Sequence, residues 1–277
     1  MKYRFIYIVL FLLGTVSISL AQDDTPKTTK KDTSYNALAT QSIINMLKPG
    51  KPPTVTLQLS FNYDIGHMDM AANDNTLFRE EDFINGRNFG TRYGYGVSLT
   101  GKIALHKEGN VRLNVMTAYR RFQSNFVISE SPEGKVAYNV FGWALGVENN
   151  FSPAKRVKPY IGFDIVTSLI YGNAVLTTDS TDFNLKIRNS VRFGVSFNLG
   201  FEYAFSDKVG LNLGYKITHA NIVGKKSQAS SNPAETYLND EKVLSSSAPI
   251  PFAGWKQFVY SSFYAGMNFY FGMKNKK

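Results

Sequence analysis

The chain has 277 residues, which is enough for one large β domain, and it contains no Cys. The lack of Cys excludes a disulfide framework, a thiolate metal site, a catalytic thiol and a lipoprotein attachment cysteine. The formal net charge is +10, but the basic residues are scattered, which favours attraction to anionic lipid or sugar over a nucleic-acid partner. Hydrophobic residues make up 43% although mean hydropathy is only -0.19. Apolar residues are therefore dispersed along most of the chain.

The N-terminus carries the one continuous apolar run. Lys2 and Arg4 precede an apolar stretch over residues 5–13, and small residues surround a cleavage position after Ala21. This order predicts a signal peptide over residues 1–21, with an uncleaved N-terminal anchor as the alternative. Two of the bases lie in this segment and no acid does, so the mature chain carries a net charge of +8.

Residues 22–53 are polar and end in a Pro- and Gly-containing stretch. Their composition predicts a flexible periplasmic lead-in with one short helix around residues 35–47. That helix could stay outside the fold, plug a lumen or lie on the membrane surface, because its apolar face is too irregular to choose among these positions.

From Thr54 onward the hydrophobic period becomes two, the repeat of a strand with one apolar and one polar face. The clearest case is residues 191–205, in which eight alternate positions are all apolar. Eight such runs occur, and each is long enough for the ~9–11 residues that a tilted strand needs to cross a bilayer. Outward aromatic residues are expected at both interfaces. We expect these at Tyr63, Tyr93, Tyr95, Tyr119, Tyr171, Phe151, Tyr160, Tyr203, Phe205, Phe269 and Phe271.

The predicted connections alternate in length. Short turns are expected at residues 107–110, 152–158 and 206–208, whereas residues 67–89, 123–134, 172–189 and 224–255 are expected to form long polar loops. Short turns on one rim and long loops on the other are typical of outer-membrane barrels. The sequence therefore predicts an all-β fold over residues 54–271, an eight-stranded antiparallel up-and-down transmembrane β-barrel with both termini in the periplasm.

A soluble eight-stranded barrel of the lipocalin type would also show alternation, but it would bury the apolar face around a ligand. The polar positions are mostly Gly, Ser, Thr, Asn and Ala. A water-exposed surface would carry more Lys, Glu and Asp, so we expect the polar set to fill a lumen and the apolar set to face lipid.

Several charged residues belong to this inward polar set. They are Lys102, Arg112, Arg120, Glu148, Asp164, Arg192, Glu202 and Lys216. A buried charge needs a partner, so we expect salt bridges that fill the lumen and fix the strand register. The alternative is a gate or narrow polar path, which the small interior of an eight-stranded barrel disfavours.

Two local features resemble bacterial outer-membrane β-barrel domain proteins of the small OmpA-like and OmpW-like class. One is the strand opening at Pro159-Tyr160-Ile161-Gly162, and the other is the last strand, which alternates toward an aromatic end at Phe271. The resemblance covers about residues 54–271 and implies location and fold but no single activity. It implies contact with outer-membrane lipid and lipopolysaccharide, and recognition of Phe271 by the barrel-assembly machinery. The basic tail of residues 272–277 departs from the family pattern.

No constellation of residues indicates catalysis or a cofactor. The three His (His67, His106 and His219) and the inward Ser60, Ser98 and Ser262 have no characteristic spacing. The acidic first loop matches no calcium motif, so no metal or cofactor is expected. Three functions stay open: a structural or surface-recognition role through the loops, especially residues 224–255, a narrow OmpW-like channel, and a lipid-modifying enzyme.

Overall fold

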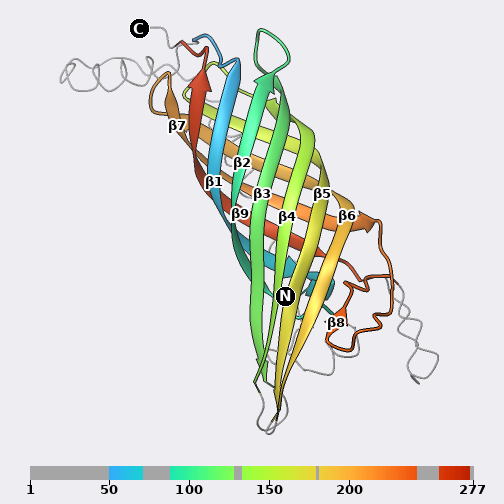
Figure 1. The fold of residues 1–277 in the computed structure, drawn as a ribbon. Coiled ribbons are helices and arrows are strands. Elements are labelled where there is room, and N and C mark those ends of the chain that lie inside the picture. The colour runs from blue at the N-terminus through green and yellow to red at the C-terminus, as the bar shows by residue number, and fades with distance from the viewer. Residues whose placement is uncertain (1–49, 71–87, 128–132, 179–180, 242–255, 275–277) are drawn as a thin grey trace, which may run out of the picture. The chain divides into compact units, whose positions relative to one another are not determined.

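The computed structural model describes residues 50–70, 88–127, 133–178, 181–241 and 256–274. These residues form a closed antiparallel barrel of eight strands (Figure 1). The barrel strands are β1 Val55–His67, β2 Tyr93–Ala104, β3 Val111–Val127, β4 Glu133–Asn150, β5 Val157–Thr178, β6 Thr181–Ala204, β7 Val209–Val223 and β9 Val259–Phe271. A 3-10 helix, η1 Met68–Met70, follows β1, and the two-residue strand β8 Glu235–Thr236 lies outside the barrel. Within the described residues, no helix is long and apolar enough to cross a membrane.

Each barrel strand pairs with its neighbour in the chain, and β1 closes the ring against β9. Val55 at the start of β1 lies opposite Phe271 at the end of β9, on the same rim as the short turns. At the turn between β2 and β3, Gly109 adopts a φ of 72° and donates its backbone N–H to the carbonyl of His106. Such a left-handed conformation favours glycine. The predicted strand number and up-and-down topology are confirmed.

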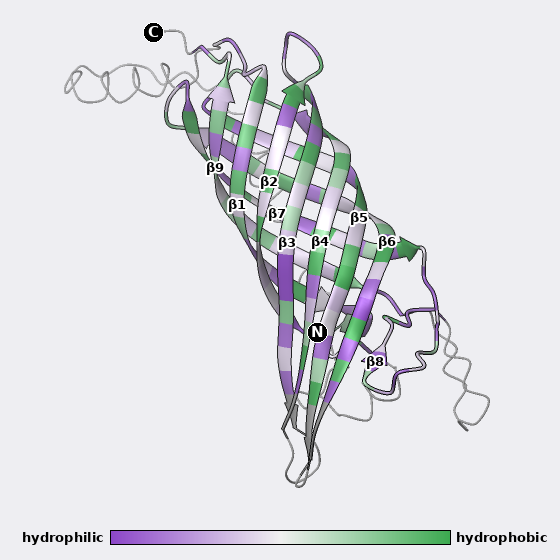
Figure 2. Ribbon diagram, viewed as in Figure 1, coloured by the Kyte–Doolittle hydropathy of each residue, from purple (hydrophilic) through white to green (hydrophobic). Residues whose placement is uncertain are grey.

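The barrel is apolar outside and polar inside. In β1, Leu59 and Phe61 are 53% and 57% exposed, whereas Ser60 and Asn62 are each 2% exposed. Hydrophobic and hydrophilic residues alternate in the same way along the other strands (Figure 2). A ligand-binding soluble barrel would bury its apolar face instead, so the lipocalin-like alternative is wrong.

Two of the predicted long loops are strands over much of their length, so the expected loops at residues 123–134 and 172–189 are wrong. β3 continues to Val127 and β4 begins at Glu133, while β5 and β6 are separated only by residues 179–180. These extensions are polar on their outer face. An antiparallel hairpin in water is stabilised by its ladder hydrogen bonds and by one buried face, so its outer face does not have to be apolar. We call the part of β3–β6 that extends beyond the other strands the arm (Figure 1).

One predicted outward aromatic residue is also misplaced. Tyr160 is 3% exposed and points into the lumen, because it shares the inward parity of Gly162 and Asp164 along β5. The other aromatic residues of the turn rim include Phe151, Phe205 and Phe271, which are exposed as expected.

Candidate functional site

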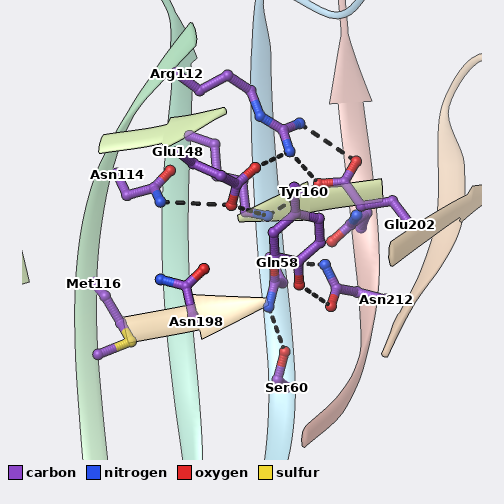
Figure 3. A network of polar contacts seen from close by, with 12 residues as sticks. Gln58, Ser60, Arg112, Asn114, Met116, Glu148, Tyr160, Asn198, Glu202 and Asn212 are labelled. Atoms are coloured by element: carbon purple, nitrogen blue, oxygen red, sulfur yellow. Dashed lines mark hydrogen bonds and ion pairs between the residues drawn. The ribbon is translucent and has the colours of Figure 1, made fainter. Parts of the chain in front are cut away.

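Four buried charged side chains form a closed cluster near the turn rim of the lumen. Figure 3 labels three of them, Arg112, Glu148 and Glu202. We call Lys102, Arg112, Glu148 and Glu202 the charge quartet. The Lys102 ammonium lies 2.9 Å from a Glu202 oxygen and 3.0 Å from a Glu148 oxygen. The Arg112 guanidinium lies 2.6 Å from Glu202 and also pairs with Glu148. Each cation therefore contacts both carboxylates, and the quartet is electrically neutral.

A shell of aromatic and amide groups surrounds the quartet. The Lys102 ammonium lies 4.3 Å from the ring centroid of Tyr160, and the Tyr160 and Tyr264 hydroxyl oxygens are 2.7 Å apart. Tyr160 donates to Asn212 at 2.9 Å, and the Asn212 amide donates to Gln58 at 2.9 Å (Figure 3). This shell links β1, β5, β7 and β9 to the quartet. Polar side chains thus join strands that are not neighbours around the ring.

Two further ion pairs lie in the lumen. Asp164 on β5 lies 3.3 Å from the Lys216 ammonium on β7, and it also accepts hydrogen bonds from Ser196 and Asn198. Asp64 on β1 lies 3.5 Å from the Arg120 guanidinium on β3 and accepts a hydrogen bond from Ser262. All four charged side chains are buried, so each pair satisfies the requirement for a partner in a low-dielectric interior.

A third ion pair outside the quartet anchors the loop between β7 and β9. The Arg192 guanidinium donates to both carboxylate oxygens of Asp240, at 2.8 and 2.7 Å. Asn221 donates to Asp240 at 2.8 Å, and Lys226 donates its backbone N–H to the same carboxylate. A two-point contact of guanidinium with carboxylate is among the stronger ion pairs. The loop that contains Asp240 is therefore fixed to the barrel wall.

An aromatic cluster occupies the lumen at the loop end. The Phe258 ring centroid lies 5.1 Å from Phe89, 5.7 Å from Phe122 and 5.9 Å from Tyr138. Tyr260 extends the cluster, with its centroid 5.1 Å from Phe122. All five side chains are buried. The lumen is therefore filled by apolar packing at the loop end and by the charge quartet at the turn end.

A small polar cavity lies between these two closures. It leaves about 20 Å³ for the centres of water molecules, roughly the room for one or two ordered waters. Its wall includes residues of the quartet, of the Asp164–Lys216 pair and of the aromatic and amide shell. The lining residues are Gln58, Asn62, Ser98, Thr100, Lys102, Asn114, Met116, Arg120, Glu148, Tyr160, Asp164, Asn198, Lys216 and Tyr264.

Lys256 is a buried base outside the strands, at the edge of the aromatic cluster. Its ammonium lies 4.8 Å from the ring centroid of Phe89, and its backbone N–H donates to the Asp240 carbonyl at 3.0 Å. Burial lowers the pKa of Lys256 to about 8, while Asp240 and Asp69 partly oppose this shift. The neighbouring carboxylates keep a charged form accessible at neutral pH.

All eight predicted lumen charges lie in the interior, and each contacts an acid or base of opposite sign. Two of the acidic partners, Asp64 and Asp240, were not among the predicted lumen charges. Asp64 had a signal, because it falls on the inward parity of the first strand. Asp240 had none, since it lies in a loop without periodicity. The aromatic cluster was also missed. Phe89 was expected in a loop, and the other four members lie just beyond the alternating apolar positions from which the strands were recognised.

The candidate catalytic groups do not form a triad among the described residues. His67 contacts Ser261 at 2.7 Å, while Ser60, Ser98 and Ser262 bond to other lumen groups. Within the described part of the chain, no carboxylate forms a hydrogen bond or ion pair with His67, so no group there orients this imidazole as a base. Most of the acidic first loop lies outside the described residues. Its described member, Asp69, accepts the backbone N–H of Gln257 at 2.6 Å.

Comparisons with known proteins give one family. The model of the outer membrane protein beta-barrel domain matches residues 51–241, and no curated sequence matches. Among solved structures, Neisserial surface protein A is 12% identical with a TM-score of 0.41, covering 79% of this chain and 97% of its own. OprG from Pseudomonas aeruginosa is 12% identical with a TM-score of 0.45, covering 80% and 98%. Ail of Yersinia pestis, solved with a heparin analogue, is 9% identical with a TM-score of 0.37, covering 80% and 99%.

The family match spans most of the barrel, from the residues before β1 through β7 and β8. It agrees with the exposed apolar face, which needs lipid around it, and with the polar lumen. The protein is thus an integral protein of the bacterial outer membrane. The chain belongs to the outer membrane protein beta-barrel domain family.

Proposed function

We propose that this barrel is an anchor for a recognition surface outside the cell, formed by the arm and by the loop between β7 and β9. The observation that carries the proposal is strand length. β5 and β6 have 22 and 24 residues, about twice the ~9–11 residues that cross a bilayer. The surplus extends from the rim with the long connections, which in outer-membrane barrels is the extracellular rim.

The loop that follows β7 is held against the arm. Lys186 of β6 donates its backbone N–H to the Ala234 carbonyl at 2.9 Å, next to the parallel pairing of β6 with β8. The Arg192–Asp240 ion pair fixes the same loop a few residues later. Loops supported by a rigid scaffold commonly carry binding functions. The arm and this loop provide such a scaffold beyond the membrane.

The closed lumen supports recognition over transport. The aromatic cluster and the charge quartet occupy its two ends, and the cavity between them leaves only about 20 Å³ for the centres of water molecules. A conducting pore needs a continuous water path, which these side chains interrupt. We propose that the lumen charges hold the strand register. We therefore expect the purified protein to be silent in a planar bilayer, and discrete single-channel currents would contradict this part of the proposal.

The test of recognition removes the arm and keeps the barrel. Residues 125–135 and 175–184 are each replaced by Asn-Gly, which suits a two-residue hairpin turn. Ser124 and Val136, and Ala174 and Leu185, would then flank the new turns, because they are already paired. Cells that display each form are tested for adhesion to arrays of glycans and extracellular-matrix proteins.

We expect the shortened variant to lose adhesion while still showing a heat-dependent gel shift, the sign of a closed barrel. Equal adhesion of both forms would refute a recognition role for the arm. Adhesion by neither form to any array member would refute a recognition role toward those partner classes.

A further inference from the structure

Four basic side chains lie on the outer face of β3, β4 and β6 at or beyond the end of the apolar belt. Arg121 is still paired with Tyr95 of β2, just before the arm begins, and the other three lie on the arm. Arg121 of β3, Lys135 of β4 and Lys186 and Arg188 of β6 follow the outward parity of their strands. We call these four residues the basic face. Lys186 and Arg188 side chains are 70% and 48% exposed, and Lys135 is exposed as well. The face therefore meets the surroundings of the barrel and not its lumen.

The strand register shows how abruptly the apolar belt ends. Tyr119 lies opposite Phe141, and one pleat further Arg121 lies opposite Asn139 and Asn139 opposite Tyr171. One pleat is about 7 Å along a strand, similar to the thickness of the headgroup layer on one side of a bilayer, roughly 5–8 Å. Tyrosine prefers this interface. Arg121 is therefore at the depth of the lipid headgroups, and Lys135 lies further out.

Neutral groups hold the Arg121 guanidinium in place. It donates to Asn139 Oδ1 at 3.2 Å and to Gln123 Oε1 at 3.4 Å. Tyr119 donates its hydroxyl to the same Asn139 oxygen at 2.8 Å. Arginine offers several donors in a planar fork that suits phosphate. Because its neighbours restrict this side chain, less freedom would be lost when it binds an anion.

Positive charge is in excess on this face. Glu235 is shared by two bases, at 3.5 Å from Lys186 and 3.4 Å from Arg188. Among the described residues, neither Arg121 nor Lys135 forms an ion pair. Among the described side chains, one carboxylate therefore faces four bases. An anionic partner would neutralise charges that these described residues leave uncompensated.

We propose that the basic face binds the phosphorylated headgroup of an anionic glycolipid in the outer leaflet. The order of groups along β3 and β4 fits such a lipid, since acyl chains meet the apolar belt, the interface meets Tyr119 and phosphate meets Arg121. Bases near a membrane surface attract anionic lipid. The inference rests on the outward orientation of the arm in the proposed function, but not on recognition by its tip.

The test measures how much lipid A the full-length protein retains. The protein is folded in phosphatidylcholine bilayers that contain diphosphoryl lipid A or its dephosphorylated form, then extracted and studied by native mass spectrometry. The basic-face variant combines R121Q, K135Q, K186Q and R188Q. The matched control combines K51Q, K107Q, K155Q and K208Q, which removes four exposed bases at the opposite rim.

We expect wild type and control to retain diphosphoryl lipid A, and the basic-face variant to bind it roughly tenfold more weakly or worse. Removal of the phosphates should weaken wild-type binding similarly. Equal binding by the basic-face variant, or an equal loss in the control, would overturn the proposal. The proposal would also be overturned if soluble dextran sulfate bound at the basic face while the protein retained no lipid A. The heat-dependent gel shift shows that each variant is folded. The arm-shortened protein keeps three of the four bases, so a negative result in the adhesion test would leave the lipid A test unaffected.

Discussion

Glu202→Gln should destabilise the barrel strongly although the side chain keeps its size. Glu202 is fully buried and neutralises half of the charge quartet, with oxygens 2.9 Å from Lys102 and 2.6 Å from Arg112. After the substitution, two buried cations share the single carboxylate of Glu148. Removal of one member of a buried ion pair typically costs about 3–5 kcal/mol, and we expect a loss in the free energy of unfolding within that range.

The double variant Lys102→Met/Glu202→Gln tests the electrostatic reason. It removes one cation together with one anion and leaves the neutral pair of Arg112 and Glu148. We expect it to be more stable than Glu202→Gln alone by at least about 1 kcal/mol, because the uncompensated buried charge is gone. Glu108→Gln, at an exposed turn position, is the control and should change stability by less than about 0.5 kcal/mol.

The assay is urea unfolding of the protein in lipid vesicles, followed by tryptophan fluorescence and by the gel mobility of unboiled samples. A loss of less than about 1 kcal/mol for Glu202→Gln would refute a net role for this carboxylate in stability. Strictly additive losses in the double variant would show that the quartet does not act through charge compensation.

Three further substitutions test other parts of the structure. Asp240→Asn should release the loop after β7 from Arg192. If the loop loses about 2 kcal/mol of stabilisation, limited proteolysis within residues 224–241 should become roughly thirtyfold faster, and an unchanged rate would show that the ion pair does not anchor the loop. Phe258→Ala should cost about 3–5 kcal/mol because it empties the centre of the aromatic cluster, yet bilayer conductance should stay absent because the quartet still fills the other end. Phe271→Asp should reduce insertion into the outer membrane, as measured by fractionation, if Phe271 is read during assembly; normal insertion would reject that role.

The sequence was sufficient for the barrel because a strand between lipid and a polar lumen must alternate at every second residue. Parity also sends Lys102, Arg112, Glu148 and Glu202 inward. Arg112 and Glu148 are direct partners in the β3–β4 ladder. The pairing of Lys102 on β2 with Glu202 on β6 could not be predicted, because these residues meet across the ring and not along a ladder. The register of adjacent strands follows from the turn that joins them, whereas a contact across the lumen depends on how the whole barrel closes.

The arm was not predicted, for a different reason. Its outer face is polar in residues such as Gln123, Asn125 and Asn173, so no apolar period marks it as strand. The backbone continues the ladder because the inner face buries Phe122 and Tyr138. The apolar alternation marks only the part of a strand that lies in the membrane, whereas the hydrogen-bonded ladder continues beyond it.

The distribution of charge connects the lumen with the outer surface. The buried charged side chains among the described residues are five acids and seven bases, a net charge of +2. Each acid is ion-paired, and the surplus bases are Lys158, whose ammonium donates to the Pro153 carbonyl at 2.6 Å, and Lys256, which lies against Phe89. Without the predicted signal peptide the chain carries +8, so +6 lies outside this buried set. An uncompensated buried charge costs several kcal/mol, so further bases could be placed only on surfaces. Where such bases border the apolar belt, as Arg121 does, they cost little in water and are available to anionic headgroups.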